Sequence, residues 1–203
     1  MSHGKDAPVP IGRCFSKKLS APLAAGAVVV LALTGCGKDN GDDAKAKDWA
    51  GTVCDKVQPQ LKAIQSANAD ITKAAEEKDP AKVQSAYKTS FDKIAKAYAA
   101  MGDAVEGAGA PPIDDGKNTQ TGAVKELRDT AKAYNAVKTT VEKLDTSDQG
   151  DFGEGLKDVA GELEKLNKTG DHALGKLQSG RLGQAMSEQA GCQKPESVPS
   201  KAA

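Results

Sequence analysis

The sequence predicts an all-α protein: an antiparallel four-helix bundle in which a short C-terminal helical turn is tied back by a disulfide. Aromatic residues make up only 3% of the chain, so the core must be built mainly from Ala, Val, Leu and Ile, which favours close-packed helices over a sheet. Four stretches carry apolar residues at spacings of three and four, with charged residues between them. Because the connections are short, we expect neighbouring helices to run antiparallel.

The first helix is expected to follow a flexible tether. Residues 36–47 are dominated by Gly, Asp and Lys and contain no large apolar side chain, which is typical of a linker. Asp48 can then cap a helix that ends near Lys78. The inward positions of this helix are spaced by three or four residues and are Trp49, Val53, Val57, Leu61 and Ile64.

The second and third helices carry the clearest periodic signal in the chain. Asp79-Pro80 resembles an N-cap followed by a proline in the first turn, and Gly107 with Pro111-Pro112 predicts the end of that helix. A loop should run to about Asn118, and the third helix should end near Asp145. The inward positions are Val83, Tyr87, Phe91, Ile94, Tyr98, Met101 and Val105 in the second helix, and Val124, Leu127, Ala131, Tyr134, Val137, Val141 and Leu144 in the third.

The fourth helix begins near Phe152 and is weakened by its glycines, each of which costs about 1 kcal/mol relative to Ala in a helix interior. We therefore expect a break near Thr169-Gly170. The glycine at Ser179-Gly180 allows a turn back toward the first helix, and a last helical turn over 182–190 leads to Cys192. The folded domain is thus predicted over 48–192, and the tail over 193–203 should be disordered.

The first 35 residues have the features of a secretory signal peptide. Arg13, Lys17 and Lys18 precede an apolar run over 21–33, and small residues follow that run. A transmembrane helix is the alternative, but a span needs about 20 apolar residues and this run is shorter. The run ends in Leu33-Thr34-Gly35-Cys36, which resembles the lipobox of bacterial lipoproteins.

That resemblance implies cleavage between Gly35 and Cys36, lipidation of the Cys36 sulfur, and anchoring on the extracytoplasmic face of the cell membrane. The alternative is an ordinary cleaved signal in which Cys36 is a chance residue. The stretch WAGTVC near the mature start and GC near the end, around an Ala- and Lys-rich body, is also similar to small secreted lipoproteins of actinobacteria. This second resemblance implies a cell-envelope setting and no particular activity.

The four cysteines are expected to have different roles. Cys14 leaves with the signal peptide and Cys36 is assigned to the lipid, whereas Cys54 and Cys192 remain near opposite ends of the folded part. Disulfides form and persist in exported proteins, so we expect Cys54 and Cys192 to pair. The alternative is two buried or free thiols.

The charge balance argues against a nucleic-acid partner. Without residues 1–35, which hold four basic residues and one acidic residue, the chain has 24 basic and 27 acidic residues, a net charge of −3. A nucleic-acid-binding domain normally carries a basic footprint. We therefore expect no nucleic-acid partner.

The sequence predicts no enzyme, no metal site and no cofactor. His172 is the one histidine after Cys36 and lacks the glutamate three residues earlier that di-metal bundles use. No nucleophile with a partner base is recognisable, and adjacent carboxylates such as Asp114-Asp115 are interpreted as solvated charge.

Three tyrosines lie on the core-facing stripes: Tyr87, Tyr98 and Tyr134. Each hydroxyl should reach water or a backbone carbonyl, or the three could line a cavity for a small apolar ligand. Two functional hypotheses follow. The first is a non-catalytic binding or structural module whose partner is an envelope protein or a cell-wall component. The alternative is a lipoprotein that binds a small apolar ligand inside the bundle.

Overall fold

The computed structural model describes residues 39–169 and 172–193, with side chains described over 41–166 and 175–193. The described residues all belong to one compact unit, Cys36–Ala203. The predicted signal peptide, its cleavage site at Gly35 and Cys36, and the tail beyond residue 193 therefore lie outside the described residues. So does the side chain of His172.

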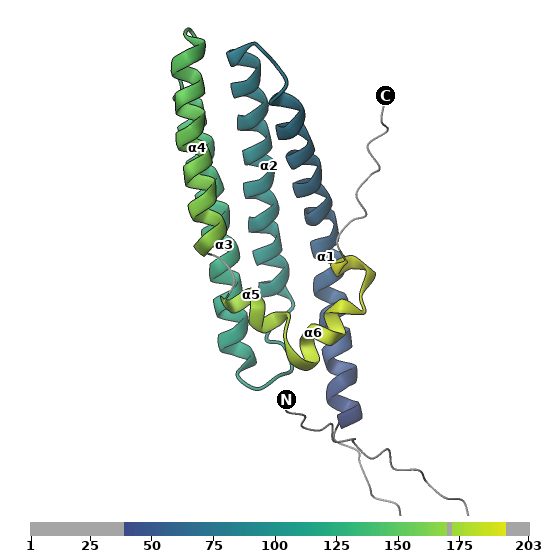
Figure 1. Ribbon diagram of the computed structural model, residues 1–203. Coiled ribbons are helices and arrows are strands. Elements are labelled where there is room, and N and C mark those ends of the chain that lie inside the picture. The colour runs from purple at the N-terminus through teal and green to yellow at the C-terminus, as the bar shows by residue number, and fades with distance from the viewer. Residues whose placement is uncertain (1–38, 170–171, 194–203) are drawn as a thin grey trace, which may run out of the picture. The chain divides into compact units, whose positions relative to one another are not determined.

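Every element in the described ranges is helical, and the four main helices pack antiparallel (Figure 1). The predicted fold class is confirmed. The elements are α1 (Asp39–Ala74), α2 (Pro80–Gly107), α3 (Gly116–Glu142), α4 (Gln149–Thr169), α5 (His172–Leu177), α6 (Gly180–Ser187) and the 3₁₀ turn η1 (Ala190–Cys192).

The core has two apolar clusters along the bundle. α2 packs on both α1 and α3, α4 and α5 pack on α3, and α6 and η1 return to α1. One cluster, near the start of α1, joins α1, α2 and α3 to α5 and α6; the other joins the four main helices. The larger members of the first are Trp49, Val53, Val105, Val124, Leu127, Leu177 and Leu182, and those of the second are Phe91, Ile94, Val137, Val141 and Val159.

The helix α1 begins at Asp39, so the prediction of a flexible tether over 36–47 is wrong for residues 39–47. The reason is that contacts with α6, which is distant in sequence, stabilise this segment as a helix. Ala46 is 0% exposed and belongs to the first cluster. Three ion pairs also join this segment to α6 and the residue after it: Lys47 with Glu188 at 2.9 Å, and Arg181 with Asp43 at 3.3 Å and with Asp42 at 4.0 Å. Exposed ion pairs add little, so burial against α6 is the main stabilising term.

Local signals placed the start and end of α2 correctly. The Asp79 carboxylate accepts from the backbone N–H of Ala81 at 3.0 Å and of Lys82 at 3.4 Å, and the helix ends at Gly107. The other boundaries differ from prediction by a few residues: α1 ends at Ala74, and α3 runs over Gly116–Glu142. α4 ends at Thr169, where a break was expected.

Two glutamines fix the ends of α2 and α3 against each other. Gln84, near the start of α2, donates to the carbonyls of Val141 (3.0 Å) and Leu144 (2.8 Å), at and just beyond the end of α3. Gln120, near the start of α3, donates to the carbonyls of Val105 (3.0 Å) and Glu106 (3.1 Å) at the end of α2. Carbonyls in a last helical turn lack the usual intrahelical partners. Val141 and Glu106 also accept from the backbone N–H groups of Leu144 and Gly109, so the glutamines add partners to carbonyls at the ends of the neighbouring helix.

The disulfide between Cys54 and Cys192 is present, as predicted, and ties η1 to the middle of α1. The two Cα atoms are 4.8 Å apart and 138 residues apart in sequence. The chain reaches this position by turning at Gly180, whose φ of +59° favours glycine. In the chain-entropy model, closing so long a loop stabilises the fold by up to roughly 5 kcal/mol.

Candidate functional site

The three tyrosines predicted to face the core are brought together through Phe91. The rings of Tyr98 (α2) and Tyr134 (α3) stack with centroids 5.6 Å apart, and Phe91 lies 6.3 Å from Tyr134 and 6.1 Å from Tyr87. All three tyrosines are partly buried against the second apolar cluster. Burial raises the pKa of Tyr87, and burial together with the neighbouring Tyr98 raises the pKa of Tyr134. The rings therefore pack on one another and on the core.

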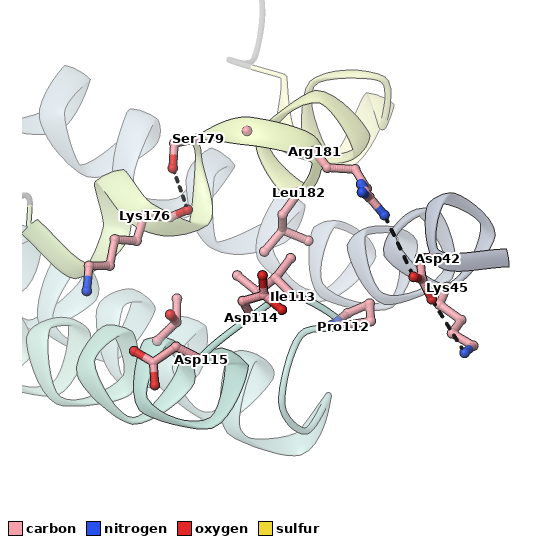
Figure 2. Close-up of a pocket in the computed structure, with 12 residues that line it drawn as sticks. Asp42, Lys45, Pro112, Ile113, Asp114, Asp115, Lys176, Ser179, Arg181 and Leu182 are labelled. Atoms are coloured by element: carbon pink, nitrogen blue, oxygen red, sulfur yellow. Dashed lines mark hydrogen bonds and ion pairs between the residues drawn. The ribbon is translucent and has the colours of Figure 1, made fainter. Parts of the chain in front are cut away.

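A different part of the structure holds a pocket of about 700 Å³ (Figure 2). It lies beside the first turns of α1, among three segments that are distant in sequence. The lining residues are Asp42 and Lys45 of α1, Pro112, Ile113, Asp114 and Asp115 of the α2–α3 loop, Thr119 of α3, and Lys176, Ser179, Gly180, Arg181 and Leu182 around the α5–α6 turn.

The α2–α3 loop is held in place by contacts to its backbone atoms. Trp49 of α1 donates its indole N–H to the Gly109 carbonyl at 2.9 Å. Gly116 lies so close to the Pro111 carbonyl that a Cβ at this position would overlap it. Asp115 adopts a left-handed conformation with φ +58°, which Asp tolerates better than most residues. The loop that presents Asp114 and Asp115 is thus fixed to both α1 and α3.

The charges of the pocket balance, because its lining contains three aspartates and the cations Lys45, Lys176 and Arg181. Arg181 lies 4.0 Å from Asp42, which is 3.7 Å from Lys45, and Figure 2 shows these three together on one side. Within the described part of the chain, Asp114, Asp115 and Lys176 form no ion pair. All three side chains are exposed, and the Asp115 carboxylate also accepts a hydrogen bond from the Asn118 side-chain amide.

The chemistry available in the pocket is that of ion pairing and hydrogen bonding. Its polar side chains are carboxylates, amines, a guanidinium and the hydroxyls of Thr119 and Ser179. Over residues 39–169 and 172–193, no group of three or more His, Cys, Asp and Glu is placed to hold a metal ion. The arrangement suits recognition of a polar or charged surface.

Sequence reasoning missed this pocket, although it had noted Asp114-Asp115 as solvated charge. No local pattern connects these residues to Arg181, because the α5–α6 turn reaches them only through the fold. The predicted pair Cys54 and Cys192 is brought together, whereas Gly35 and Cys36 lie outside the described residues. Of the helices that the structure describes, none combines the length and the apolar character needed to cross a bilayer.

No match to this chain was found among family models, curated proteins or solved structures. The site is therefore interpreted from its own residues.

Proposed function

We propose that this chain is an extracytoplasmic lipoprotein, anchored to the cell membrane through Cys36, whose helical domain is a non-catalytic binding or structural module of the cell envelope. The observation that carries the proposal is the tetrapeptide Leu33-Thr34-Gly35-Cys36 behind a cationic and an apolar segment. A diacylglyceryl group supplies two acyl chains, and two chains are enough for stable attachment.

The disulfide supports this compartment independently of the lipobox. Cys54 and Cys192 are bonded, and structural disulfides are rare in the cytosol but common in exported proteins. Cys54 is also 0% exposed, so the bond is part of the core of the domain. An exported helical domain held near the membrane is positioned to meet an envelope protein or a cell-wall component.

The alternative, a small apolar ligand beside the tyrosines, has weaker support. Tyr98 and Tyr134 stack on each other and Phe91 packs nearby, so aromatic rings occupy the interior that such a ligand would need. Native mass spectrometry of the protein purified from membranes tests this alternative. A bound apolar compound that disappears in Tyr134→Leu would favour it over the binding module.

Anchoring is tested with a pair of cysteine substitutions. Cys36→Ala removes the acylated sulfur, so the protein should be found as precursor or in the medium and should lack the lipid mass on its N-terminal peptide. Cys14→Ala, in the segment that is removed, is the matched control and should leave membrane attachment unchanged. If Cys36→Ala remained in the membrane fraction with its signal cut elsewhere, the lipoprotein proposal would be wrong.

Absence of catalysis is tested by screening the purified lipid-free domain for hydrolase and transferase activity. We expect none, because the pocket contains exposed charges and no recognisable pair of nucleophile and base. Turnover that survives rigorous purification and is lost on substitution of Asp114 or Lys176 would replace the binding-module proposal with an enzyme.

A further inference from the structure

The distance between the acylated residue and the folded domain is short. α1 begins at Asp39, three residues after Cys36, and a chain spans at most about 3.5 Å per residue. The first residue of α1 therefore lies within about 10 Å of Cys36. This limit follows from covalent geometry and is well below the reach of the tether expected from the sequence.

The pocket lies at this same end of the domain. Asp42 and Lys45, in the first two turns of α1, form one of its walls. The other walls are attached to α1 as well: Arg181 contacts Asp43 at 3.3 Å, and Trp49 binds the carbonyl of Gly109 in the α2–α3 loop. With the disulfide from η1 to Cys54, these contacts make the pocket and the start of α1 one rigid end.

From this arrangement we infer that the pocket end of the bundle lies against the phospholipid headgroups of the membrane, with the pocket opening onto them. The inference rests on the proposed anchoring at Cys36. The occupant of this surface is the bilayer itself, because a domain held within about 10 Å of its anchor has this end at headgroup level.

The charges of the pocket suit such a neighbour. Asp114 and Asp115 can meet headgroup ammonium groups, and Lys176 can meet phosphates, since none of the three has an ion pair within the described residues. The three acidic and three basic lining residues cancel, so the covalent anchor, and not net attraction, holds this end at the membrane. Its position should therefore be the same on zwitterionic and on anionic bilayers.

The rest of the bundle should project away from the membrane. α1 has 36 residues, which at 1.5 Å per residue gives a length of about 54 Å. Residues 36–203 carry a net charge of −3, so an anionic bilayer does not attract the long sides of the domain. The connection between α1 and α2 should therefore lie far from the headgroups.

The test uses the full acylated protein in vesicles, with a fluorophore at either end and an acceptor on the lipid headgroups. Asp114→Cys labels the pocket end, and Glu76→Cys, which removes the same charge, labels the α1–α2 connection. We expect energy transfer to be several-fold greater from position 114, and equal on phosphatidylcholine vesicles and on vesicles containing phosphatidylglycerol. A third variant, with a Gly/Ser insert of about 12 residues after Gly37, adds about 20 Å of reach and should reduce the difference.

Flotation of the labelled protein with the vesicles is measured first. Failure to float would overturn the lipid anchor and with it this inference. Flotation with equal transfer from the two positions, or with greater transfer from position 76, would overturn the orientation while leaving the anchor intact. A difference that the Gly/Ser insert does not reduce would show that the short connection is not its cause.

Discussion

At the scale of single residues, Gly191 decides how closely the C-terminal turn approaches α1. An ideal Cβ at this position would lie 2.5 Å from the Cys54 carbonyl oxygen and 2.7 Å from its carbonyl carbon. Both are backbone atoms of a helix, so they cannot move aside as a flexible side chain can. Glycine at 191 is what allows η1 to lie on α1 beside the disulfide.

We expect Gly191→Ala to lower the free energy of unfolding by about 1–3 kcal/mol, the usual cost of overpacking. The measurement is the urea midpoint of the oxidised protein. Gly161→Ala in α4 is the control: nothing lies within 4 Å of its Cβ position, so it should raise stability by about 0.5–1 kcal/mol through helix propensity. Equal stabilities for Gly191→Ala and the parent protein would show that η1 is not closely packed on α1.

At the scale of elements, the early start of α1 depends on the burial of one small residue. Ala46 is 0% exposed, whereas Ala44, half a turn earlier, is exposed. We expect Ala46→Asp to destabilise the domain by at least about 2 kcal/mol, because it buries an unpaired carboxylate. Ala44→Asp should have little effect, since a carboxylate near a helix N-terminus is tolerated or favourable.

Chemical denaturation of the two alanine variants gives the comparison, and hydrogen exchange of the amides over 43–47 gives a second measurement. Protection of these amides is expected in the parent protein and in Ala44→Asp. If Ala46→Asp were as stable as Ala44→Asp and these amides exchanged freely, the segment would be the tether that the composition predicted.

The helix ends joined by Gln84 and Gln120 give a second prediction at this scale. Each side chain donates two hydrogen bonds to carbonyls of the partner helix, and a net hydrogen bond contributes about 0.5–1.5 kcal/mol. Gln84→Ala and Gln120→Ala should each lower stability by about 1–2 kcal/mol. Because the two sites lie at opposite ends of α2, their effects should add.

The control for the glutamines is Gln178→Ala, an exposed residue that makes no side-chain hydrogen bond within the described residues. Thermal unfolding followed by circular dichroism should leave this variant within about 0.5 kcal/mol of the parent, as is usual for surface positions. A double substitution that costs no more than either single one would mean that the two ends do not stabilise the helix pair independently.

At the scale of the whole molecule, the four main helices should differ in their stability against local unfolding. α2 packs on α1 and α3 together, whereas α4 packs on α3 and contains Gly153, Gly155 and Gly161. Elements with fewer partners open at lower free energy. We expect native-state hydrogen exchange to show the lowest protection among the four main helices in α4 and the highest in α2 and α3.

Gly153→Ala tests whether the glycines cause the lower protection of α4. Nothing lies within 4 Å of the Cβ position at residue 153, so the substitution adds no close contact. The substitution should raise protection in α4 selectively, through helix propensity. Gly155→Ala should raise it less, because the end of the Leu144 side chain must shift to make room for the Cβ. Uniform protection across all four main helices would show that the bundle opens as a single unit.

Much of the fold could be predicted because its signals are local. Asp79-Pro80 and Gly107 set the ends of α2 through capping and backbone geometry, and the apolar stripe at helical spacing marked which face of α2 would be buried. The pairing of Cys54 with Cys192, which the structure contains, was predicted from the expectation of export and from the separate roles expected for Cys14 and Cys36. The lipobox hypothesis likewise rests on adjacent residues.

Only the tertiary structure decided the features that combine distant segments. Composition alone predicted a linker over 39–47, but α6 returns to bury Ala46, and Glu188, the residue after α6, pairs with Lys47. The pocket joins Asp42, Asp114 and Arg181 from three parts of the chain. The spacing of apolar residues predicts which face of a helix is buried, because residues three and four positions apart lie on the same face. The spacing does not predict which other helix covers that face, because that contact is between segments distant in sequence and forms only in the folded structure.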